Sequence, residues 1–186
     1  MSETQTTTPA PADTPENGSG SREGAAPSGG YSHEHRPLAG YSVLSSIFAV
    51  AFTGGLTAAY RKRGGELPER LGPWDVVTTG AATHKLSRLI TKDKVTSFAR
   101  APFVRHEESS GHGEVSEEPR GTGLRLAIGE LLVCPYCVSQ WIAGAFAVGY
   151  VGAPRLTRLI AFVYTAETIA DFMQLGYRAA EDALSD

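Results

Sequence analysis

The chain has 186 residues, of which 41% are apolar and 20% are charged, and its formal net charge at pH 7 is -3. Residues 1–40 carry that whole net charge, because the remaining residues hold equal numbers of acidic and basic side chains. The balance excludes a basic surface of the kind that binds nucleic acid. Two cysteines are too few for a disulfide framework, and they suit a reducing compartment at least as well as an oxidising one.

Residues 1–40 form a tail that is rich in Gly, Pro, Ser and Thr and contains few apolar side chains. Such a segment cannot bury enough apolar surface to offset the backbone entropy that ordering costs, so we expect it to be disordered. Its start has neither the basic residues nor the apolar run of a secretory signal peptide. The sequence therefore predicts an uncleaved tail before the first apolar run.

Two charge-free stretches of twenty or more residues predict membrane helices: residues 41–60, which end at Arg61, and residues 131–154, which end before Arg155. At about 1.5 Å per residue, each is long enough to cross a hydrocarbon core of about 30 Å. Two further stretches have a helical pattern but carry charges. The predicted helices cover about residues 41–60, 74–91, 131–153 and 156–177.

The predicted fold is all-α: a helical integral membrane bundle of three or four transmembrane helices, formed by residues 41–178 and followed by a short tail, 179–186. Residues 74–91 decide the number of spans, because small residues fill their first half and basic side chains their second. They cross the bilayer or lie flat on it. The alternative fold is a soluble helical bundle whose buried helices only look like membrane segments.

The expected location is a cell membrane, which the chain crosses several times. Lys and Arg side chains are more frequent on the side that holds the loop at 92–130, which places that loop and the cysteine pair in the cytoplasm. The tail is cytoplasmic with four spans and outside with three. Within the loop, residues 92–103 are basic and amphipathic, typical of a segment on an anionic leaflet, whereas residues 107–123 are acidic, rich in Gly and expected to be mobile.

Cys134 and Cys137 enclose Pro135 and Tyr136 in a Cys-Pro-Tyr-Cys motif that resembles the active site of glutaredoxins. The strands that a glutaredoxin needs are not predicted around it. A zinc site would need two more ligands, from His106 and His112 or from a second chain, so the two cysteines are weak metal candidates. The favoured interpretation is structural: a helix cap with a proline in the first turn and two packed thiols.

Charged residues in two of the predicted helices suggest a pairing. Carboxylates at membrane depth are costly and usually meet a partner or a water-filled cavity. We expect the acidic face of 156–177 to pair with the basic side of 74–91, although a proton or ion site is the alternative. The residues concerned are His84, Lys85, Arg88, Glu167 and Asp171.

Two segments, THKLSRLITKDKVTSFARAPF at 83–103 and GELLVCPYCVSQWIAG at 129–144, resemble a family of small bacterial membrane proteins known as domain of unknown function 1360. The resemblance covers about residues 73–175. His84 and Lys85 depart from a more arginine-like pattern, and the helix at 41–60 is additional to the family core. The resemblance implies membrane residence and a shared cysteine motif, but no activity.

The predicted function is therefore that of an integral membrane protein acting as a structural or interaction module, without catalysis and without a cofactor. Its expected partners are the lipid bilayer and either a second copy or another membrane protein. No serine, histidine and acid trio, phosphate-binding glycine loop or pair of catalytic carboxylates can be assembled. The alternative function is that of a membrane-embedded thiol protein, in which Cys134 and Cys137 exchange electrons or bind zinc between chains.

Overall fold

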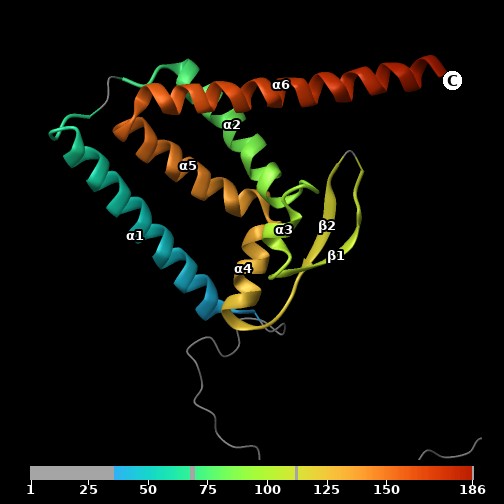
Figure 1. Ribbon diagram of the computed structural model, residues 1–186, viewed down its shortest axis with the longest axis horizontal. Coiled ribbons are helices and arrows are strands. Elements are labelled where there is room, and N and C mark those ends of the chain that lie inside the picture. The colour runs from blue at the N-terminus through green and yellow to red at the C-terminus, as the bar shows by residue number, and fades with distance from the viewer. Residues whose placement is uncertain (1–35, 68–69, 112, 186) are drawn as a thin grey trace, which may run out of the picture. The chain divides into compact units, whose positions relative to one another are not determined.

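A computed structural model describes residues 36–67, 70–111 and 113–185, and these residues are mostly helical, with one small antiparallel sheet (Figure 1). In chain order the elements are α1 (Leu38–Lys62), α2 (Pro73–Thr91), α3 (Ser97–Arg100), β1 (Val104–Ser109), β2 (Val115–Pro119), α4 (Gly123–Val133), α5 (Pro135–Gly152) and α6 (Pro154–Ser185).

Helix α1 begins earlier than the predicted range of 41–60. The predicted disordered tail, 1–40, lies outside the described residues up to residue 35, but its last three residues form the first turn of α1. These residues are helical because they pack on α4: a Cβ added to Gly40 would lie 2.7 Å from the Cβ of Ala127. Contact with a distant helix, which the composition of the tail does not reveal, fixes the start of α1.

Within the described residues, α1 is the one helix that is by itself long and apolar enough to cross a membrane, with a mean hydropathy of 1.6. Only 6% of its most apolar 18-residue window is buried against the rest of the chain. Helices α4 and α5 meet the same requirement only as a pair, and they are bent by 83° at the break between them. By composition and length alone, the described residues therefore support one membrane helix, or two if the bent pair is one span, and not the predicted three or four.

The predicted helix at 131–153 is divided. Leu131–Val133 end α4, Cys134 has an extended backbone (φ -102°, ψ 102°), and α5 starts at Pro135. A proline disfavours the helical conformation of the residue before it, and its missing N–H is harmless in a first turn. The charge-free composition of this stretch therefore concealed a sharp corner that Pro135 imposes.

Helix α2 packs against both α5 and α6, and this contact contains the largest apolar cluster. Its buried members are Ala82, Phe146, Tyr150 and Ala161. The Tyr150 hydroxyl, within this cluster, lies 2.8 Å from the hydroxyl of Thr79. Helix α1 packs instead on α4 and α5.

Helix α6 continues to Ser185, past the predicted end at residue 177, so the expected C-terminal tail, 179–186, is helical over its described part. Its sequence there, RAAEDALS, is rich in good helix formers and contains neither Gly nor Pro. Every residue of 171–185 is exposed, and this end of the helix extends away from the other elements of the described unit (Figure 1).

The prediction that residues 92–130 form a loop is wrong, because this segment contains α3, both strands and most of α4. Strands β1 and β2 pair antiparallel from Val104 opposite Pro119 to Ser109 opposite Val115, with an irregularity near Glu107. Two buried valines, Val104 and Val115, hold the hairpin against the rest of the chain. The acidic and Gly-rich composition indicated mobility, but exposed strands also carry acidic side chains, as Glu108 and Glu118 show.

Gly129 is where α4 packs most closely on the turn that precedes the hairpin. A Cβ there would lie 2.7 Å from the backbone oxygen of Phe103. We expect Gly129→Ala to lower the free energy of unfolding by about 1–3 kcal/mol, because a methyl group would overpack this contact. Thermal unfolding of the purified protein measures the change. Gly54→Ala on α1 is the matched control: a Cβ there meets nothing within 4 Å. A similar loss of stability in both variants would contradict this account.

Candidate functional site

The cysteine pair forms the corner between α4 and α5. Cys134 is the N-cap of α5, and its Sγ accepts a hydrogen bond of 3.2 Å from the backbone N–H of Cys137. The two residues form a disulfide, with their Cα atoms 5.3 Å apart. The helix cap with a first-turn proline, one of the predicted roles, is thus the local geometry. Cys137 is exposed, and Cys134 is half-buried.

Both cysteines line an open groove of about 760 Å³ between the first turns of α1, the end of α4 and the start of α5. Most of its accessible lining is apolar. On one wall the phenol of Tyr41 donates a hydrogen bond of 2.5 Å to the carboxylate of Glu130. On another, the rings of Phe48 and Trp141 meet edge to face with 5.2 Å between their centres. Glu130 and Trp141 belong to the sequence segment that carries the cysteines, whereas Tyr41 and Phe48 come from α1.

The α1 side of this groove was missed by sequence reasoning, which treated 41–60 only as a span. Its position depends on close helix contacts through glycine. Gly40 allows α1 to approach α4, and a Cβ on Gly144 of α5 would lie 3.1 Å from the ring of Phe48. Small residues at such crossings predict a close helix contact only when the partner helix is already known.

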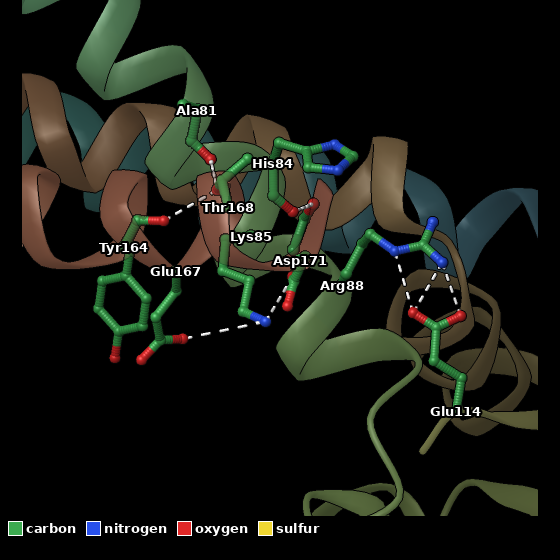
Figure 2. A network of polar contacts seen from close by, with 10 residues as sticks. Ala81, His84, Lys85, Arg88, Glu114, Tyr164, Glu167, Thr168 and Asp171 are labelled. Carbon is green, nitrogen blue, oxygen red and sulfur yellow. Dashed lines mark hydrogen bonds and ion pairs between the residues drawn. The ribbon is translucent and has the colours of Figure 1, made fainter. Parts of the chain in front are cut away.

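The predicted charge pairing concerns the contact between α2 and α6, which Figure 2 shows. The ammonium of Lys85 lies 2.7 Å from a carboxylate oxygen of Asp171 and 3.9 Å from one of Glu167. Hydroxyl groups of α6 add contacts to the backbone of α2. The Thr165 hydroxyl donates a hydrogen bond of 2.8 Å to the backbone oxygen of Thr78, and the Thr168 hydroxyl lies 3.0 Å from the backbone oxygen of Ala81.

The other two basic candidates do not meet the acidic face of α6. Arg88 binds both carboxylate oxygens of Glu114, the residue before β2, with distances of 2.6–3.0 Å (Figure 2). The imidazole of His84 lies over the ring of Phe172, with 6.5 Å between ring centres. The structure therefore joins Lys85 to α6 and uses Arg88 to attach the hairpin.

A buried ion pair in the 92–119 region was also missed. The side chain of Arg100 is 1% exposed and that of Glu117 is 5% exposed, and they lie 2.5 Å apart. The same guanidinium donates to the backbone oxygens of Ile90 and Asp93 at 2.7 and 2.9 Å. Sequence reasoning assigned Arg100 to a basic face on a lipid leaflet, because a four-residue helix gives no periodic pattern that separates buried from exposed positions.

The structure brings no additional zinc ligands close to Cys134 and Cys137 within the described residues. In the described part of the chain no three His, Cys, Asp or Glu side chains are grouped so that they could hold a metal ion. His106 lies on the exposed strand β1, and His112 is outside the described residues. Binding by Cys134 and Cys137 would therefore require reduction of the disulfide and ligands from elsewhere.

Comparison with known proteins matches the model of a family described as "Protein of unknown function (DUF1360)" to residues 79–177. The chain is similar to UPF0713 protein YngL of Bacillus subtilis, with 29% identity over 85 residues, or 44% of this chain and 62% of that protein. It is also similar to sporulation protein YjcA of the same organism, with 35% identity over 72 residues, or 37% of this chain and 61% of that protein.

The chain thus spans about three fifths of the length of these curated relatives. No solved structure matches it. The matched residues run from α2 through the hairpin and the cysteine corner into α6, and so include both the Lys85 contact and the groove wall that Glu130 and Trp141 form. The family match covers more than half of the chain, which therefore belongs to the DUF1360 family of proteins of unknown function.

Proposed function

We propose that this protein is an integral membrane protein that crosses the bilayer through α1, α2, α5 and the first half of α6, and that it acts as a structural or interaction module. One observation carries the proposal: α1 is apolar along its length, and its most apolar window is only 6% buried within the chain. Exposed apolar surface costs about 25 cal/mol per Å² in water, so a helix of this kind needs a cover. A bilayer supplies one.

The surfaces of the other helices support the same environment. Large apolar side chains are exposed on α2 and along the first half of α6, where Phe162 is 65% and Ile169 is 55% exposed. Lys85 and Thr165, two polar residues on these helices, are instead directed at the neighbouring helix. Helices α2 and α5 have 19 and 18 residues. At about 1.5 Å per residue each approaches the thickness of a hydrocarbon core.

Chain direction supports four spans over three. Asp75 pairs with Arg158 near the start of both helices, and Lys85 pairs with Asp171 further along each. Helices α2 and α6 therefore run side by side in the same direction, as two helices that enter the bilayer from one face would. In this arrangement the hairpin, the cysteine corner, the start of α1 and the end of α6 share the more basic side, which we assign to the cytoplasm.

The exposed end of α6, 171–185, would then project from the membrane on that side. Met173, Tyr177 and Leu184 are more than 60% exposed there. We propose that it contacts a second copy or another membrane protein.

Carbonate extraction combined with cysteine labelling tests the membrane proposal. In a Cys134→Ser/Cys137→Ser background, Glu66→Cys reports on the side between α1 and α2, and Glu108→Cys reports on the hairpin. We expect the protein in the carbonate pellet, with a membrane-impermeant maleimide labelling Glu66→Cys in intact cells and Glu108→Cys only in broken cells. Recovery in the carbonate supernatant would overturn membrane integration. Labelling of both sites in intact cells would overturn the four-span topology.

A second candidate function is thiol exchange at Cys134 and Cys137. The observation that favours it is that both residues line the groove, at the N-terminus of α5, where free N–H groups stabilise a thiolate. A purely structural cap would not need an accessible groove beside the exposed Cys137. Release of metal by a chelator, without reversible disulfide formation, would instead favour zinc binding between chains.

A further inference from the structure

The groove beside the cysteine pair has the size and walls of a small-molecule site. Its volume of about 760 Å³ lies within the range of ligand pockets, which are mostly apolar with a few polar groups. Leu44 and Phe48 of α1 and Trp141 of α5 provide flat and aliphatic surfaces. Because α1 is long and apolar enough to cross a membrane by itself, the groove lies beside the part of the molecule that we assign to the lipid.

The polar groups in the groove restrict its occupant. Glu130, which accepts the Tyr41 hydrogen bond, and Arg36 both line the groove and carry opposite charges, so the lining favours neither an anionic nor a cationic occupant. The side-chain amide of Gln140, which also lines the groove, can donate a hydrogen bond to a neutral carbonyl oxygen. The chemistry of the groove thus fits an apolar, uncharged molecule with carbonyl oxygens and an aromatic-sized ring.

We propose that the groove binds a lipid-soluble quinone, and that this quinone oxidises the dithiol form of Cys134 and Cys137. The inference rests on the thiol function proposed above and names its substrate class. In the reaction, both S–H bonds break and one S–S bond forms. The two electrons and two protons that the thiols lose convert the quinone to a quinol.

The test uses the full chain in bilayer discs. The disulfide is reduced with dithiothreitol, the reductant is removed, and decylubiquinone is added. Free thiols are counted by maleimide mass tagging, and quinone consumption is followed by its ultraviolet absorbance. We expect both thiols to disappear with consumption of one quinone per chain, as a two-electron exchange requires. Leu44→Trp, which fills the groove without touching the cysteines, should slow this oxidation by at least about tenfold.

Two controls separate the possible failures. Val50→Trp places the same bulk on an exposed position of α1 outside the groove and should react like the wild type. An excess of 2-hydroxyethyl disulfide, a neutral linear disulfide, should oxidise wild type and Leu44→Trp equally. Oxidation by that disulfide but not by the quinone would overturn the quinone proposal and leave thiol exchange standing. Oxidation by neither would overturn both, and equal quinone rates in wild type and Leu44→Trp would overturn the groove as the binding site.

Discussion

Arg100→Ala is expected to lower the free energy of unfolding by about 3–5 kcal/mol, as removal of one partner from a buried ion pair does. Arg100 and Glu117 are almost completely buried, so the variant leaves a carboxylate without a counter-charge. It also removes donors from the backbone oxygens of Ile90 and Asp93. Thermal unfolding in detergent measures the loss, and limited proteolysis should show cleavage within the hairpin before the helices are cut.

Arg105→Ala is the matched control, because Arg105 lies on the exposed face of the neighbouring strand β1. It should change stability by less than about 0.5 kcal/mol, as surface substitutions usually do. The double variant Arg100→Met/Glu117→Leu should recover most of the stability, since removing both charges also removes their desolvation cost. A double variant as unstable as Arg100→Ala would show that the backbone contacts of Arg100, rather than its charge, hold this region together.

The buried pair also shows where sequence reasoning reaches its limit. Long, apolar helices were predictable from composition, and α1, α2, α5 and α6 overlap the predicted ranges, although α5 starts only at Pro135 and α6 continues to Ser185. The hairpin and α3 were not predictable. Their folded conformation depends on contacts such as the hydrogen bond from Arg100 to the backbone of Ile90, and such contacts leave no periodic pattern in the sequence. A basic residue in an amphipathic pattern is normally exposed, and only its partner Glu117 reveals that this one is buried.

Only the wall of the groove that residues 130–141 form was predictable from the sequence. Glu130, Cys134, Cys137 and Trp141 follow one another within a short segment, so a shared site could be suspected from their spacing. Tyr41 and Phe48 are 89 and 93 residues away from Glu130 and Trp141, and reach them only because Gly40 and Gly144 permit close helix contact. Without a partner helix, Gly40 is one small residue among the many of the tail. The site therefore emerges from packing rather than from a motif.

Lys85→Glu is expected to have the second large effect, a loss of about 2 kcal/mol from the free energy of unfolding. Lys85 is 19% exposed and lies between α2 and α6, so the variant places a third carboxylate beside Asp171 and Glu167. Like charges at this distance repel one another, and the two half-exposed carboxylates lose the ammonium that they share. The yield of folded protein in membranes and its thermal unfolding in detergent measure the effect.

Adding Asp171→Lys to Lys85→Glu tests whether the pairing is direct. The reversed pair restores opposite charges at the same two positions, and the new lysine also lies one helical turn from Glu167, so at least about half of the lost stability should return. Glu181→Lys, on the exposed end of α6, is the matched control and should rescue nothing. Equal rescue by both lysines would mean that net charge is what matters. Rescue by Asp171→Lys alone would show that the direct Lys85–Asp171 ion pair stabilises the packing of α2 against α6. The same ion pair would then fix the angle at which the exposed end of α6 leaves α2.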